Sequence, residues 1–190
     1  YGNEVKTDGQ FVIVNTSKAY QVGAGTTPDS NSVTVYSTDS NGQWFFYQEL
    51  YPVGNGNAVG FDKDIAIDNG NIFIGGPGEV AVFQLDSSGF WIQTQNLHPS
   101  DGAGGFGNSL AIHGNLAVIG TSSQNAYFFR LNTNGNWVEE QVVSAPNGHL
   151  NPFFGASVDI YDGVAVIGAP GYYDVHPNLA ACGAVFAYEY

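Results

Sequence analysis

A stretch of fifteen residues occurs four times in this chain, and no other feature limits the possible folds so strongly. The copies begin at Tyr1, Phe61, Phe106 and Phe154 and align with one another without gaps. Similarity at such regular spacing indicates stacked copies of one supersecondary unit. A fold built from repeats is therefore expected.

Each copy predicts a β-hairpin. Its first arm carries apolar residues two positions apart, such as Ile65 and Ile67, which places them on one face of a strand. Its second arm is apolar throughout, which predicts a strand covered on both faces. Gly, Asn and Asp favour tight hairpin turns. The predicted two-residue turns are Asp8-Gly9, Asn69-Gly70, Gly114-Asn115 and Asp162-Gly163.

A second hairpin follows each of the first three copies. In each one an aromatic residue lies eight positions before a Trp, a Gly lies two before it, and a Gln lies four after it. The Trp and Gln residues are Trp44 and Gln48, Trp91 and Gln95, and Trp137 and Gln141. Units of four antiparallel strands at this period are typical of β-propeller blades. The Trp residues are expected to pack between blades.

The copies resemble FG-GAP repeats, the blades of integrin α-subunit-like propellers and of many secreted proteins. The fourth copy carries the full motif, from Phe154-Gly155 to Gly168-Ala169-Pro170. The resemblance implies an all-β fold, a β-propeller of four-stranded antiparallel blades with four repeats present. The expected blades form one region and cover approximately residues 1–50, 61–97, 106–143 and 154–190.

The fourth repeat contains only three of the four expected strands, because its outer strand would fall beyond Tyr190. Three explanations stay open: a longer propeller of which this is a piece, completion by another subunit, or a three-stranded last blade. An apolar edge strand promotes aggregation unless it is covered, which disfavours the third explanation. The predicted assembly edge comprises Val185, Phe186, Ala187, Tyr188 and Tyr190.

The longer loops of such a propeller all lie at one end of the blades, where binding sites usually occur. We therefore expect a secreted or cell-surface binding or adhesion module for a protein or glycan ligand. Aromatic and carboxylate side chains suit such ligands. The candidate ligand-binding residues are Tyr20, Asp29, Asp101, Tyr172, Tyr173, Asp174 and His176. The alternatives are a structural subunit that assembles through its open edge strand and, less favoured, an enzyme.

The net charge of −13, with only four Lys and Arg residues, argues against nucleic-acid partners and anionic membranes. No apolar run has the length needed for membrane insertion. A single cysteine, Cys182, excludes an internal disulfide bond. The sequence Asn15-Thr16-Ser17, expected on a loop, is a glycosylation site if the protein is eukaryotic and secreted.

The sequence predicts neither a cofactor nor a metal site. The nearest acidic cluster contains Asp62, Asp64 and Asp68, but two-residue turns are too short to wrap a calcium ion. The four histidines are scattered and form no metal-binding or catalytic motif. No catalytic residues are predicted, and the chain is not expected to be an enzyme.

Overall fold

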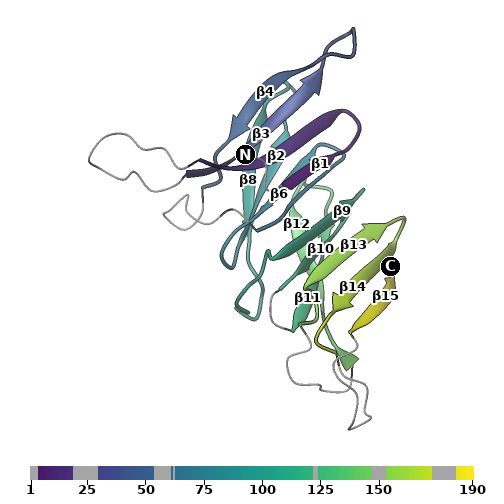
Figure 1. The fold of residues 1–190 in the computed structure, drawn as a ribbon. Helices are drawn as coiled ribbons and strands as arrows, with labels where there is room; N and C mark the ends of the chain where they lie inside the picture. Colours follow the sequence, from purple (N-terminus) through teal and green to yellow (C-terminus); the bar gives the residue numbers. More distant parts are fainter. Residues whose placement is uncertain are drawn as a thin grey trace, which may run out of the picture.

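The computed structural model describes residues 4–18, 30–53, 61, 63–121, 124–146, 153–172 and 183–190. These residues form fifteen strands in four antiparallel sheets. The sheets follow one another in chain order, with β1–β4 at one end of the row and β13–β15 at the other (Figure 1). The described part of the chain contains no helix long and apolar enough to cross a bilayer.

The strands of each sheet run in sequence order, and we call the four sheets blades one to four. Blade one contains β1 (Glu4–Thr7), β2 (Phe11–Lys18), β3 (Ser30–Thr38) and β4 (Trp44–Leu50). Blade two contains β5 (Ile65–Asp68), β6 (Asn71–Gly75), β7 (Val80–Leu85) and β8 (Trp91–Leu97). Blade three contains β9 (Ser109–His113), β10 (Leu116–Gly120), β11 (Asn125–Leu131) and β12 (Trp137–Ser144). Blade four contains β13 (Ser157–Tyr161), β14 (Val164–Ala169) and β15 (Ala184–Glu189).

This arrangement confirms the predicted fold class: four antiparallel sheets of propeller-blade type, the last one three-stranded. The inner strands β1, β5, β9 and β13 contact one another in chain order. Each blade therefore packs face to face on the next. The core consists of three apolar clusters, one at each of the three blade boundaries.

The predicted turns hold in three of the four hairpins. Both turn residues have positive φ at Asn69-Gly70 and at Asp162-Gly163, as a type I′ hairpin requires. The two-residue turn at positions 114–115 is also present. The prediction for the first hairpin is wrong, because four residues, 8–11, connect its paired positions instead of two. Its ladder ends at the Thr7–Val12 pair, and Asp8 Oδ1 accepts hydrogen bonds from the N–H groups of Gln10 and Phe11.

The second strand of each repeat is covered on both faces only where a blade lies on both sides. All residues of β6 and β10 are buried. In β14, exposed and more buried positions alternate, because blade three covers one face of blade four and no described residue covers the other. The expectation of two covered faces is therefore wrong for β14.

The Phe and Gly residues of the repeat motif join neighbouring blades. Phe61, Phe106 and Phe154 are at most 1% exposed and lie within the three core clusters. Gly155 has a φ of +89°, and a Cβ added to Gly120 would overlap the Gly155 carbonyl oxygen. The first Gly of one repeat and the last Gly of the preceding repeat thus lie in backbone contact, which leaves no space for a side chain.

Two of the three Trp residues pack on the preceding blade, as predicted. Trp91 makes an edge-to-face contact with Phe11, with ring centroids 5.4 Å apart, and Trp137 makes one with Phe73 at 5.0 Å. Both Trp residues are 2% exposed. Trp44 is 51% exposed, so the prediction that it packs between blades is wrong within this structure.

The repeated Gln residues form a link between outer strands that the sequence pattern did not explain. The side chain of Gln48 donates to the Trp91 carbonyl at 2.8 Å and accepts from the Trp91 N–H at 2.9 Å. Gln95 makes the same two bonds to Trp137, at 3.3 and 2.7 Å. Each Gln side-chain amide therefore makes the pair of backbone hydrogen bonds that a residue of a neighbouring strand would make, and it joins the outer strands of two blades.

Candidate functional site

Strands β2, β4, β8, β12 and β14 all finish at the same end of the sheets, because consecutive strands are antiparallel, and we call this end the loop end. The opposite end, the turn end, contains the tight hairpin turns. Of the predicted ligand-binding residues, the structure describes Asp101 and Tyr172, and both lie at the loop end. Tyr20, Asp29, Tyr173, Asp174 and His176 lie outside the described residues.

Asp101 lies at the loop end and holds the loop between β8 and β9 against blade three. Its carboxylate accepts hydrogen bonds from the Tyr127 hydroxyl at 2.8 and 3.0 Å, from the Asn125 side chain at 3.2 Å and from the Ala103 N–H at 3.0 Å. The hydrogen bond from Tyr127 is the main reason that the pKa of Asp101 is lowered. Asp101 therefore acts as a structural tie within the loop end.

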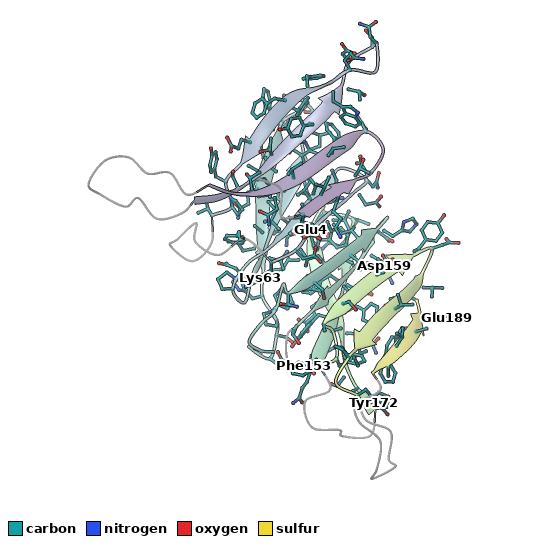
Figure 2. All side chains as sticks on the ribbon, in the orientation of Figure 1. Glu4, Lys63, Phe153, Asp159, Tyr172 and Glu189 are labelled. Carbon is teal, nitrogen blue, oxygen red and sulfur yellow. The ribbon has the colours of Figure 1, made fainter. Side chains whose placement is uncertain are left out.

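Tyr172 follows β14 and packs against the last strand. Its ring meets that of Phe186 edge to face, with centroids 5.3 Å apart. Phe153 and Tyr172 lie at the same end of blade four (Figure 2). The tyrosine is half-buried and adds to the cluster between blades three and four. No described contact brings Asp101 and Tyr172 together.

A carboxylate that sequence reasoning overlooked lies in the loop end of blade two. Glu79 immediately precedes β7 and is only 8% exposed. Its Oε2 atom is buried and has no hydrogen-bond partner among the described residues. The Nε2 atom of His98 lies 3.9 Å away, on a side chain that is 46% exposed. The sequence offered no signal for this pair because the two residues come from different connections.

The expected position of Asn15 on a loop is wrong. It lies in the middle of β2, paired with Glu4 on one side and Val33 on the other, and it is 1% exposed. Its Oδ1 atom is buried without a hydrogen-bond partner among the described residues. Strand β2 continues to Lys18, since its ladder with β3 extends to the pair of Lys18 and Ser30, and Thr16 Oγ1 also donates to the Ser32 carbonyl. In the folded chain a glycosylating enzyme has no access to this amide.

The predicted assembly edge forms strand β15, which pairs with β14 and has no described strand on its other side. Val185 is 73% exposed, whereas Phe186 and Tyr188 pack into the cluster between blades three and four. Tyr190 stacks on Phe128 at 4.5 Å, and its hydroxyl donates to Gln141 at 2.7 Å. Gln141 is the third Gln of the repeat, and its partner is a side-chain hydroxyl instead of the backbone of a Trp.

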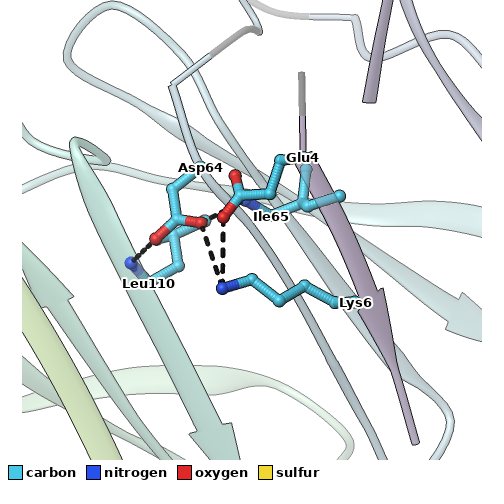
Figure 3. Close-up of polar contacts among 5 residues, drawn as sticks. All are labelled: Glu4, Lys6, Asp64, Ile65 and Leu110. Carbon is cyan, nitrogen blue, oxygen red and sulfur yellow. Dashed lines mark hydrogen bonds and ion pairs between the residues drawn. The ribbon is translucent and has the colours of Figure 1, made fainter. Parts of the chain in front are cut away.

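Three charged side chains meet where the inner strands of blades one, two and three converge (Figure 3). Lys6 Nζ lies 3.1 Å from Glu4 Oε1 and 3.8 Å from Asp64 Oδ1. Asp64 Oδ2 accepts the Leu110 N–H of blade three at 2.7 Å. The pKa of Lys6 is raised: burial lowers it, but the hydrogen bond to Glu4 and the nearby carboxylates together raise it more.

The carboxylates of Asp64 and Asp68 both accept hydrogen bonds from backbone N–H groups of blade three. Asp68 Oδ2 accepts the Gly114 N–H of blade three at 2.6 Å, further along the same two strands than the bond between Asp64 and Leu110. The predicted acidic cluster thus contributes two carboxylates to blade packing, while Asp62 lies outside the described residues. Within the described ranges, no three His, Cys, Asp or Glu side chains are grouped as metal ligands would be.

Asp64 is expected to make stability depend on pH. Burial, followed by the hydrogen bond to Glu4, raises its pKa from 3.8 to about 7. Because the folded state binds this proton more tightly than the unfolded state, the contribution is fully present below pH 3.8 and is lost as the pH rises through 7. The Asp64→Asn variant does not lose this contribution. Its free energy of unfolding relative to wild type should therefore rise as the pH increases from 3.8 to 7, by up to about 1.4 kcal/mol per pH unit.

Urea unfolding of both proteins at several pH values between 4 and 8 measures this difference. The asparagine keeps an acceptor for the Leu110 N–H and offers a donor to Glu4, so it imitates the protonated carboxyl group. Parallel stability curves for the two proteins would contradict the prediction.

The sequence profile of the FG-GAP repeat family matches residues 91–132 and 137–188. Both matches begin at the Trp of an outer strand and continue through the three inner strands of the next blade. The family unit therefore spans a blade boundary, in agreement with the Trp, Gln and Gly contacts between blades. No curated protein matches the chain. Blades, motif contacts and profile agree, and the chain belongs to the FG-GAP repeat family.

Proposed function

We propose that this chain is a binding module that takes its ligand at the loop end of the blades. Long connections on a rigid β scaffold commonly carry binding residues. The observation that carries the proposal is the Glu79 carboxylate, whose buried Oε2 atom has no hydrogen-bond donor among the described residues. A buried oxygen without a donor is costly, and a ligand that supplies one relieves the cost.

The chemistry of this position favours a ligand with a cationic or hydrogen-bond-donating group. Glu79 supplies a negative charge and His98 supplies an exposed ring beside it. The net charge of −13 adds a long-range attraction for positively charged partners. A protein surface with Lys or Arg, or a glycan hydroxyl group, fits this description. We further propose an extracellular or cell-surface location, and the resemblance to integrin-like propellers supports this proposal.

The test uses the chain on a peptide array that contains Lys and Arg and on a glycan array. Glu79→Gln should weaken any binding at least tenfold, because a charge-assisted hydrogen bond contributes about 1.5–3 kcal/mol. Asp162→Asn is the control: it removes the same charge at the turn end, where Asn tolerates the positive φ. Equal binding by wild type and Glu79→Gln, or equal loss in both variants, would reject the site.

Assembly is the second candidate function, and the open edge of blade four favours it. Strand β15 has an unpaired edge in the described structure, and Val185 on it is largely exposed. Edge strands of this kind bind further strands unless they are covered. In this alternative the partner is another subunit or a further propeller segment.

A further inference from the structure

Two acceptor atoms lie close together at the loop end of blade two. The Oε2 atom of Glu79 is buried without a hydrogen-bond partner among the described residues, and the Nε2 atom of His98 lies 3.9 Å from it. This separation is too long for a hydrogen bond between the two atoms. In the tautomer that carries its proton on Nδ1, the imidazole offers a lone pair from Nε2. The pair then has two acceptors and lacks a shared donor.

The described part of the chain supplies no donor to the Glu79 oxygen. The residues immediately before Glu79, at positions 76–78, are Gly-Pro-Gly and have no polar side chain. The cationic side chain of Lys6 pairs with carboxylates at the inner strands, and that of Arg130 pairs with one on β12. The donor that satisfies this oxygen is therefore expected from another molecule.

We infer that the ligand of this site carries a primary ammonium group, which Glu79 Oε2 and His98 Nε2 hold together. The inference rests on the proposed function, because it names the chemistry of the ligand at the same site. An ammonium nitrogen has three N–H donors and can donate to both acceptors at once. Two bonds of about 2.8 Å to acceptors 3.9 Å apart meet at roughly 90° at the nitrogen, so one ammonium group can reach both.

A guanidinium group and a sugar hydroxyl group fit this pair of acceptors less well. The planar fork of an arginine makes two parallel hydrogen bonds that match the two oxygens of one carboxylate. Here the two acceptors belong to different side chains and lie 3.9 Å apart. A hydroxyl group has one proton, so it can donate to only one of the two atoms. The ammonium group alone among these three matches both acceptors.

Access to the pair favours the same group. Glu79 is 8% exposed, whereas the side chain of His98 is 46% exposed, so a ligand reaches the carboxylate beside the imidazole. A lysine side chain carries a compact charge at the end of a slender four-carbon stem, which suits a restricted approach. A lysine on the surface of a partner protein is therefore the ligand that we assign to this site.

Two small ions test this chemistry on the whole chain. The n-butylammonium and n-butylguanidinium ions share one alkyl chain and differ only in the head group. In NMR titrations, n-butylammonium should shift the amide resonances of residues 79 and 98 until they saturate. The guanidinium ion should bind at least about tenfold more weakly, because it loses one charge-assisted hydrogen bond. Glu79→Gln should weaken the binding of n-butylammonium by a similar factor.

Two substitutions of His98 test its part in the preference. His98→Phe keeps an aromatic ring and removes the acceptor, so the affinities for the two ions should become equal. His98→Gln provides an acceptor oxygen and should retain the preference for n-butylammonium. His113→Phe is the matched control, since His113 lies at the turn end and its ring packs on that of Tyr161 at 4.7 Å. This control should bind both ions like wild type.

The outcomes separate this inference from the proposed function. Equal affinity of the wild type for the two ions overturns the ammonium assignment, and a preference that survives in His98→Phe overturns the shared grip. Absence of a saturable shift with n-butylammonium overturns the inference as well. In all three cases, array binding that depends on Glu79 would still support a ligand site there. Arrays without such binding reject the proposed function itself.

Discussion

Gly120→Ala should destabilise the chain by about 3 kcal/mol, the upper end of the usual cost of overpacking. An added Cβ would overlap the Gly155 carbonyl oxygen of blade four. Backbone cannot rotate away as a side chain can, so blades three and four must move apart. Phe154, which is fully buried at this boundary, would lose contacts as they separate. Urea unfolding monitored by circular dichroism measures the change.

Gly168→Ala is the matched control for this effect. Gly168 pairs with Ser157 in blade four as Gly120 pairs with Ser109 in blade three, and in both an added Cβ meets the hydroxyl of that serine. Only Gly120 also meets backbone of the next blade. We expect Gly168→Ala to change the stability of the monomer by less than about 1 kcal/mol. Equal costs at both positions would show that contact between blades is not the reason for glycine.

Trp137→Ala should cost about 3–5 kcal/mol, as is typical when a buried large aromatic side chain is removed. The indole packs on Phe73, and its Nε1 donates to Asn71 Oδ1 at 3.1 Å. Truncation leaves a cavity between blades two and three and removes that hydrogen bond. The free energy of unfolding in urea again gives the magnitude.

Trp44→Ala removes the same side chain from the same register position of blade one. Because Trp44 is 51% exposed, we expect a cost below about 1 kcal/mol for the monomer. The contrast between the two variants measures what a neighbouring blade contributes. A loss at Trp44 as large as that at Trp137 would mean that Trp44 is already covered in solution.

The sequence predicted the elements well because their signals are local. Alternation of apolar residues identified the strands, and Asn69-Gly70 and Asp162-Gly163 identified two turns that require positive φ. The constant spacing of Trp and Gln identified the outer strands. The repeat also predicted that the fourth repeat contributes only three strands before Tyr190. These signals depend on residues within one hairpin, whose geometry sequence spacing alone constrains.

The candidate site was less predictable, since its residues come from separate connections. Asp101 stays a predicted ligand-binding residue, and the sequence did not indicate its contacts with Tyr127 and Asn125. Glu79 was not singled out, because nothing in the sequence shows that its carboxylate is buried beside His98. Asn15 was placed on a loop, because β2 is longer than the repeat pattern indicates.

The sequence by itself determined the repeating blade, its turns and the register of its Trp, Gln and Gly residues. Only the tertiary structure decided what those residues contact. Trp44 and Trp137 have the same local sequence pattern, yet one is exposed and the other buried. The physical reason is that burial depends on the neighbouring blade, and its presence is not encoded within the repeat. Likewise, the Gln side chains reach across a blade boundary, so their partners become visible only when the blades are packed.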